Sequence, residues 1–137
     1  MSDTKTVYTC FSTDVIHDGH LNIINEAKKY GRVVVGALSD EESIRYNKFP
    51  TVSFENRCRM YRAIDGVDEV IEQDDMMYKD VIEKIHPDYV IHGDNWKEGY
   101  LSAIRNNVKA LLDVYGGQII DVPYTFNEKT ERIDRQL

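Results

Sequence analysis

Short runs of β-branched and aromatic residues alternate with longer amphipathic segments along the chain. Five runs have the length and composition of buried strands, at residues 6–11, 32–38, 69–72, 89–92 and 118–122. Four segments between them have helical periodicity, at residues 21–27, 54–65, 77–85 and 101–115. The pattern therefore predicts five strands that alternate with four helices.

The predicted helices have recognisable apolar stripes and ends. In the first helix the expected buried stripe consists of Leu21, Ile23, Ile24 and Ala27. Gly31 is expected to end this helix as a residue in the left-handed conformation, Pro87 to close the third helix, and Gly116 with Gly117 to stop the fourth.

Strands separated by helices of this length cannot pair as a hairpin meander. The sequence therefore predicts a parallel sheet with right-handed crossovers and helices on both faces. The expected fold class is α/β, a small doubly wound (Rossmann-like) sheet of about five strands in a single domain over residues 1–137. In such sheets a ligand binds beyond the C-terminal ends of the strands, so residues after the first, second and fourth strands are candidates for chemistry.

Composition narrows the class of partner. The chain has 137 residues, with 24 acidic and 17 basic side chains and a formal net charge of −7. This balance argues against broad electrostatic binding to nucleic acid or an anionic membrane, whereas a small phosphorylated ligand needs only local positive charge. The longest apolar run, residues 33–38, is too short to span a bilayer, and the N-terminus lacks a signal-peptide pattern. Two cysteines are too few for a disulfide framework, so a cytoplasmic location is expected.

The most informative segment, residues 12–20 (STDVIHDGH), directly follows the first strand and leads into the first helix. A helix N-terminus offers N–H groups and a positive dipole end to an anion. Gly19 permits close approach of a phosphate, and His17 and His20 project donors to the same place. These residues predict a phosphate site without a resident metal. Two alternatives stay open: the histidines are solvated, or they bind zinc together with Cys10 or Cys58.

This segment resembles the HxGH signature of nucleotidyltransferases, in which His17, Gly19 and His20 match and Asp14 lies three residues before the first histidine. The resemblance implies that His17 and His20 are catalytic and contact the α- and β-phosphates. It also assigns nucleotide binding to the rest of the segment, namely Ser12, Thr13, Asp14 and Gly19.

A second similarity lies in the connection after the second strand and indicates the cytidylyltransferase branch, as in glycerol-3-phosphate cytidylyltransferase. Lys48 stands at the position of a loop lysine, which implies a catalytic role at the phosphates of CTP or of the acceptor. Arg57 matches a nucleotide-binding arginine, although it could equally pair with a nearby glutamate. Tyr46 stands where the glycerol phosphate enzyme often has a second lysine, and Lys79 is next to a position that touches the acceptor, so both are expected at the acceptor.

After the fourth strand, Gly93-Asp94-Asn95-Trp96 is similar to the GDDW segment of the family, with Asn95 in place of the second aspartate. The resemblance places Gly93, Asp94 and Trp96 at the nucleotide. A Gly-Asp strand end offers close backbone approach and a carboxylate acceptor for the exocyclic amine of cytosine, and Trp96 can pack over the loop or the base. Taken alone, the segment is also compatible with a simple turn and a structural tryptophan.

The last signature of the family, RTxGIST, is only partly present in residues 124–131 (YTFNEKTE), where two threonines match. The leading Tyr-Thr is similar to cytidylyltransferase domains fused to phosphoenolpyruvate mutases in phosphonate biosynthesis. The resemblance assigns Tyr124, Thr125 and Thr130 to the nucleotide. Loss of the Gly-Ile-Ser core leaves open a domain that binds a nucleotide without turning it over.

Together these resemblances imply a cytidylyltransferase that transfers CMP from CTP to a small phosphate or phosphonate acceptor and releases pyrophosphate. The acceptor would resemble glycerol 3-phosphate or an aminoethyl- or hydroxyethylphosphonate. Mg²⁺ is expected to accompany CTP, and the family implies a homodimer. Two alternatives remain: a non-catalytic nucleotide-binding domain with an altered last signature, and an adenylyltransferase, since adenylyltransferases share the HxGH signature.

Overall fold

The computed structural model describes residues 4–123 and confirms the predicted α/β fold. Its strands are β1 (Thr6–Phe11), β2 (Arg32–Leu38), β3 (Glu69–Gln73), β4 (Tyr89–Gly93) and β5 (Gln118–Val122). They form one sheet in the order β3-β2-β1-β4-β5, and every pairing is parallel. The predicted strands are correct to within one residue, because β3 and β4 each extend one residue further than expected.

The helices are α1 (Asp18–Ala27), α2 (Asp40–Arg45), α3 (Phe54–Arg62), α4 (Lys79–Ile85) and α5 (Leu101–Asp113), with a 3₁₀ turn η1 (Asp94–Lys97). Helix α2 and turn η1 were not predicted. Ser39 is the N-cap of α2, and its Oγ accepts a hydrogen bond from Glu42 N at 3.2 Å. The first turn of α2 is acidic. Both features stabilise a helix N-terminus.

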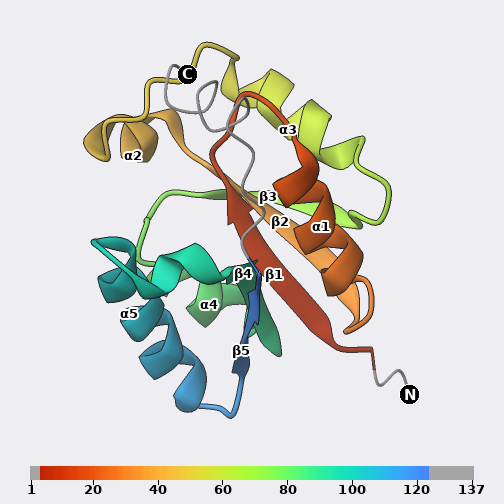
Figure 1. Cartoon of the computed structure of the whole chain (residues 1–137), viewed down its shortest axis with the longest axis vertical. Coiled ribbons are helices and arrows are strands. Elements are labelled where there is room, and N and C mark those ends of the chain that lie inside the picture. The colour runs from red at the N-terminus through yellow and green to blue at the C-terminus, as the bar shows by residue number, and fades with distance from the viewer. Residues whose placement is uncertain (1–3, 124–137) are drawn as a thin grey trace.

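Helices cover both faces of the sheet (Figure 1). On one face α1 and α3 pack over a core that includes Val7, Ile24 and Tyr61. On the other face α4 and α5 pack over a core that includes Tyr8 and Val108. This division follows from the strand order, because the crossovers to β2 and β3 run on one side and those to β4 and β5 run on the other.

Two expectations about α1 are wrong. Ile24 and Ala27 are buried, but Leu21 is 41% exposed, so the buried stripe is narrower than predicted. The C-cap of α1 is Lys28, and Gly31 comes three residues later, at the start of the path into β2. A Cβ at Gly31 would lie 2.2 Å from the carbonyl oxygen of Lys5, so glycine is required there by close backbone packing.

Strand β1 separates from β4 towards its C-terminal end. It pairs with β2 along its whole length, from Thr6 to Phe11, but with β4 only through Val7 and Tyr8. The strand order also reverses between β1 and β4, where open α/β sheets have a crevice for ligands. The fold therefore places the predicted residues after β1 and β4 on the two sides of one opening.

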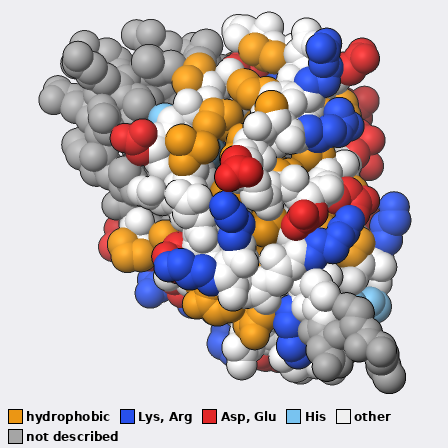
Figure 2. Space-filling model, turned by 90° about the vertical axis from the view of Figure 1, so that its right-hand side faces the viewer, with side chains coloured by type: hydrophobic (Ala, Val, Ile, Leu, Met, Phe, Trp, Pro, Cys, Tyr) orange, Lys and Arg blue, Asp and Glu red, His pale blue; other side chains and the backbone are white. Residues whose placement is uncertain are grey.

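The surface over α1 and α3 carries basic and acidic side chains interspersed with each other and with smaller apolar areas (Figure 2). Among the helices within residues 4–123, none has the length and hydropathy that a transmembrane span requires.

Candidate functional site

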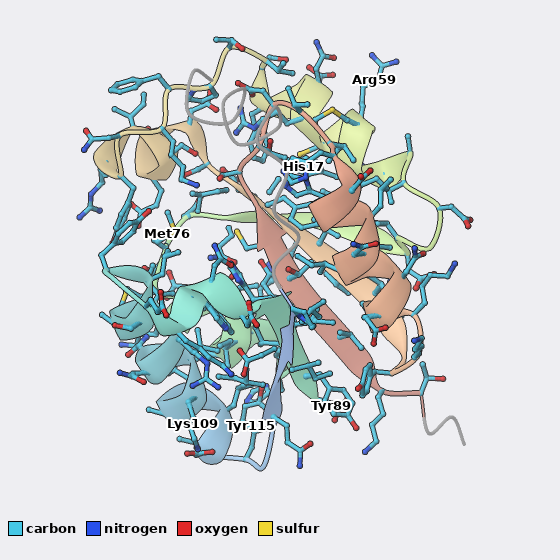
Figure 3. The ribbon with its side chains drawn as sticks, in the orientation of Figure 1. His17, Arg59, Met76, Tyr89, Lys109 and Tyr115 are labelled. Carbon is cyan, nitrogen blue, oxygen red and sulfur yellow. The ribbon has the colours of Figure 1, made fainter. Side chains whose placement is uncertain are left out.

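A pocket of about 300 Å³ opens at the C-terminal ends of β1 and β4. This volume is typical of small-molecule sites, which favour such switch points in parallel sheets. Its wall is formed by the end of β1, the start of α1, the connections after α2 and β3, the end of β4 and the start of α5. Two lining residues, His17 and Met76, lie on either side of the end of β1 (Figure 3).

The structure brings most of the predicted site residues to this pocket. Those that line it are Ser12, Thr13, Asp14, His17, Gly19, His20, Lys48, Gly93 and Trp96. Four others are not part of the lining: Tyr46, Arg57, Lys79 and Asp94. The remaining three, Tyr124, Thr125 and Thr130, lie outside the described residues.

The two histidines of the motif cap helix α1. Nδ1 of His17, the N-cap residue, accepts a hydrogen bond from Gly19 N at 3.0 Å, and Nδ1 of His20 accepts one from His17 N at 3.2 Å. The imidazoles thus replace the Ser or Thr and the Glu or Gln of an ordinary capping box. Because both Nδ1 atoms are acceptors, the proton of each neutral ring is on Nε2. The backbone therefore makes both rings Nε2–H donors, which is the polarity that an anionic ligand requires.

His20 is held in its neutral form. Burial lowers its pKa to about 3, and the nearby His17, Lys48 and His92 act in the same direction. A second ring proton would have to bind to Nδ1 of His20, which accepts a hydrogen bond from the backbone N–H of His17. The two N–H groups would then face each other and the hydrogen bond would be lost. At neutral pH His20 can therefore donate to a ligand without carrying a charge.

A positive charge reaches the motif from the connection after α2. Lys48 Nζ donates to Ser12 Oγ at 3.2 Å, at the end of β1. The carboxylate of Asp14 fixes this connection further along, because it accepts hydrogen bonds from Thr51 N (2.8 Å), Thr51 Oγ1 (3.1 Å) and Val52 N (3.3 Å). Residues 12–20 and Lys48 together form what we call the phosphate side of the pocket.

Arg57, which was predicted to bind the nucleotide, lies buried behind the pocket with 0% exposure. Its guanidinium donates to the carbonyl oxygens of Leu38 and Val52, each at 2.8 Å, and pairs with Asp40 at 2.9 Å. The structure therefore gives Arg57 a positioning role: it joins the end of β2 to the connection that carries Lys48. Its acidic partner is Asp40, not one of the glutamates considered from the sequence.

The end of β4 and the following turn η1 supply a stacked pair of rings. His92 and Trp96 lie parallel, with ring centroids 4.3 Å apart and an angle of 7° between their planes. Trp96 is 1% exposed and donates from Nε1 to Asp121 at 2.6 Å, and Arg105 holds the same carboxylate at 2.8 Å. Nδ1 of His92 bonds to the carbonyl of Gly93 at 2.8 Å, and burial lowers the pKa of His92. Trp96 thus orients a neutral histidine in the pocket wall.

Sequence reasoning missed two kinds of lining residue. His92 had a usable signal, because it lies directly before Gly93 at a strand end. The other kind forms what we call the apolar side of the pocket, and its residues looked like ordinary core. They are Cys10, Leu38, Met76, Tyr78 and Ile104.

The zinc alternative finds no support in residues 4–123. Within them no three His, Cys, Asp or Glu side chains gather to hold a metal ion. Burial raises the pKa of the Cys10 thiol to about 12, although Lys48 opposes this shift, so the thiol is protonated at neutral pH.

The sequence has recognisable relatives among curated proteins. Ethanolamine-phosphate cytidylyltransferase of Arabidopsis thaliana is 38% identical over 93 residues, covering 63% of this chain and 21% of the relative. FAD synthase of Ferroglobus placidus is 35% identical over 89 residues, covering 65% and 59%. The bifunctional protein HldE of Desulfatibacillum aliphaticivorans is 28% identical over 136 residues, covering 97% and 27%. The chain thus spans about a quarter of two of these relatives and about three fifths of the other.

Solved structures share the fold. The lipopolysaccharide core biosynthesis protein from Thermoplasma volcanium GSS1 has a TM-score of 0.71 to this chain, with 21% identity over 90% of this chain and 98% of that one. The sequence pattern of the cytidylyltransferase-like family matches residues 8–133, which include the histidine cap, Lys48 and the end of β4. The chain therefore belongs to the cytidylyltransferase-like family of nucleotidyltransferases.

Proposed function

We propose that this domain is a cytidylyltransferase that transfers CMP from CTP to a small phosphate or phosphonate acceptor. The observation that carries the proposal is the phosphate side of the pocket, where two Nε2–H donors at a helix N-terminus meet the ammonium group of Lys48. Such an arrangement neutralises charge on a phosphate and on its transition state.

In the proposed reaction an acceptor oxyanion attacks the α-phosphorus of CTP. A P–O bond forms, the bond from the α-phosphorus to the bridging oxygen breaks, and pyrophosphate leaves with the electron pair. A general base is unnecessary, because the acceptor already carries an ionised oxygen at neutral pH. Catalysis therefore consists of positioning and charge stabilisation. His17 and His20 would donate to the bridging and α/β-phosphate oxygens, and Lys48 to the α-phosphate and the acceptor.

Magnesium is proposed to arrive with the triphosphate, because Mg²⁺ in such sites is held mainly by phosphate oxygens and water. The described residues do not form a protein cage for it. No cluster of three ligating side chains occurs in residues 4–123, and both Asp14 oxygens already accept hydrogen bonds from the connection after α2. The phosphate side of the pocket instead supplies hydrogen-bond donors for the phosphate groups of the nucleotide.

The choice of CTP is supported by the 38% identity to a relative named as a cytidylyltransferase. A second candidate, adenylyl transfer from ATP, is supported by the 35% identity to an FAD synthase, whose named product contains adenine. The two candidates share the phosphate side and differ in the base that the end of β4 must accept.

The test is pyrophosphate release with Mg²⁺ and either CTP or ATP. Four acceptors are compared: glycerol 3-phosphate, ethanolamine phosphate, 2-hydroxyethylphosphonate and 2-aminoethylphosphonate. We expect release with CTP and at least one acceptor, and a CMP-linked product by ³¹P NMR. Lys48→Gln should lose this activity, whereas Lys109→Gln, a change on the exposed face of α5, should keep it. CTP binding without release for any acceptor would indicate the non-catalytic alternative, and release with ATP alone would indicate adenylyl transfer.

A further inference from the structure

The connection between β3 and α4 places a tyrosine in a backbone conformation that tyrosine rarely adopts. Tyr78 has φ 67° and ψ 7°, in the left-handed region. A bulky residue persists there only where its surroundings over-determine the conformation, and such residues concentrate at binding and catalytic sites. The strain at Tyr78 therefore calls for a functional explanation.

Hydrogen bonds to Asp75 impose this conformation. Its carboxylate accepts from Met77 N at 2.9 Å and from Lys79 N at 3.2 Å. Its carbonyl oxygen accepts from Tyr78 N at 3.0 Å and from the side chain of Gln73 at 2.8 Å. The backbone on both sides of Tyr78 is thus fixed without any contribution from the phenol, and the result is to direct that side chain into the pocket wall.

The phenol of Tyr78 is 3% exposed and lines the pocket, edge-on to the ring of Tyr8 with centroids 5.9 Å apart. The hydroxyl of Tyr8 donates to Gln73 at 2.5 Å. In contrast, the hydroxyl of Tyr78 makes no hydrogen bond to any residue in 4–123. Burial raises the pKa of Tyr78 well above its usual value, so the group stays protonated. Within residues 4–123 the fully enclosed side-chain polar atoms that lack a partner are Thr9 Oγ1, Ser43 Oγ and Arg57 Nε, so the hydroxyl of Tyr78 is not one of them and keeps some accessible surface. Because Tyr78 lines the pocket, a ligand there can bond to this hydroxyl.

The surroundings of Tyr78 favour an uncharged partner. The other residues of the apolar side, Cys10, Leu38, Met76 and Ile104, carry no charge. Asp14 is the one carboxylate among the described lining residues, and its oxygens are taken by the connection after α2. A buried ammonium group without a counter-charge is strongly disfavoured, whereas a hydroxyl needs only one hydrogen-bond partner.

Resting on the cytidylyltransferase function proposed above, we propose that Tyr78 selects the acceptor by a hydrogen bond between its phenol hydroxyl and a hydroxyl on the carbon chain of the acceptor. The substrate is then a small hydroxyalkyl phosphate or phosphonate, and the aminoalkyl counterpart is discriminated against.

Three acceptors that differ at a single group test this assignment: 2-hydroxyethylphosphonate, 2-aminoethylphosphonate and ethylphosphonate. Their affinities for the protein with CMP bound are measured by calorimetry, and their kcat/KM values with CTP by pyrophosphate release. We expect the hydroxyl compound to bind about tenfold more tightly than the other two, as expected for one buried hydrogen bond. In Tyr78→Phe its affinity should fall to that of ethylphosphonate, and the affinity of ethylphosphonate itself should not change.

The ratio of the affinities of two acceptors, measured on the same variant, is insensitive to partial loss of folding. Tyr115→Phe is the matched control, because its hydroxyl bonds to Pro87 O at 2.7 Å, away from the pocket, and it should keep the wild-type ratio. Equal affinities in the wild type, tighter binding of the amine, or an unchanged ratio in Tyr78→Phe would each overturn the assignment. Selective binding without pyrophosphate release would support the assignment and refute the transferase. Release at equal kcat/KM for all three acceptors would refute the assignment alone.

Discussion

The two sides of the pocket are built in different ways. The phosphate side comes almost entirely from nine consecutive residues, 12–20, which follow strand β1 directly and form a turn and a helix N-terminus. The apolar side is assembled from residues 10 to 104, which meet only because the sheet brings their elements together. A contiguous motif carries its geometry in local hydrogen bonds, whereas an assembled surface depends on tertiary packing throughout the domain.

This difference also separates their chemistry. On the phosphate side the backbone N–H groups of His17 and Gly19 fix the ring tautomers, so each donor is set before a ligand arrives. On the apolar side the hydroxyl of Tyr78 is the polar group that can contact a ligand, and it makes no hydrogen bond to any residue in 4–123. We therefore expect changes on the phosphate side to affect turnover and changes on the apolar side to affect the choice of acceptor.

The largest effect is expected from His17→Asn. Asparagine is a favoured N-cap residue, so its side-chain oxygen can still accept from Gly19 N and helix α1 should be retained. The Nε2–H donor is lost, and kcat should fall by roughly two to three orders of magnitude, as for other donors to a developing charge. The measurement is pyrophosphate release, with unfolding in urea as the check on stability.

The control for this variant is His86→Asn. His86 ends α4 with φ 45°, a left-handed conformation that asparagine tolerates, and it contacts Tyr115 away from the pocket. Its activity should match that of the wild type. Near-full activity in His17→Asn would remove the phosphate side from the catalytic assignment.

A smaller effect, on stability, is expected from Arg57→Met. The change leaves two carbonyl oxygens, of Leu38 and Val52, without their donor, and leaves Asp40 without its partner. The free energy of unfolding should fall by about 2–4 kcal/mol, as for other losses of one partner of a buried charged group. Arg59→Met, on the exposed side of the same helix, should change it by less than about 0.5 kcal/mol. Equal stabilities of the two variants would contradict the positioning role of Arg57.

Gly36→Ala tests the packing beneath the apolar side. A Cβ at this position of β2 would lie 1.6 Å from the hydroxyl oxygen of Tyr8, so the ring must move and its hydrogen bond to Gln73 must break. Overpacking of this kind costs about 1–3 kcal/mol, measurable by urea unfolding. Adding Tyr8→Phe removes the closest clashing atom, and the double variant should lose less stability than the sum of the single variants. Strict additivity would show that the two positions do not interact.

The same contrast explains how far the sequence could be interpreted. The strands and the motif after β1 were predictable, because hydrophobic periodicity and a strand–turn–helix motif are local properties. Helix α2 was missed although its signal was present, since Ser39 followed three residues later by Glu42 is a capping pattern. The sequence therefore contained the information needed to predict α2.

Other features could not be predicted. An arginine in an amphipathic helix gives no sign that its guanidinium will be enclosed, because the carbonyl groups that hold Arg57 come from β2 and from the connection before α3. In the left-handed conformation of Tyr78 the expected residue is asparagine or glycine. A tyrosine is held there by the contacts of its backbone with Asp75. The first feature depends on a tertiary hydrogen bond to Leu38 and the second on local hydrogen bonds to Asp75, and hydrophobic periodicity encodes neither.

The smallest effect is a dependence of stability on pH that belongs to the phosphate side. His20 has a pKa of about 3 in the folded protein, against an ordinary value of 6.5 in the unfolded chain. Between these values the unfolded chain binds a proton that the folded protein does not, so stability must fall as pH decreases from about 6.5 towards 3. Only well above pH 6.5 do both states lack the proton, and there His20 contributes no dependence.

His20→Gln isolates this contribution, because glutamine can still accept from His17 N as the third residue of a capping box but does not titrate. Urea unfolding between pH 6.5 and 5, above the range in which most carboxylates titrate, should show a shallower slope in His20→Gln than in the wild type or in His86→Asn. An unchanged slope would mean that His20 accepts a proton in the folded protein. The phosphate side would then present a charged imidazolium in place of a neutral donor, and its contrast with the apolar side would be greater than the structure indicates.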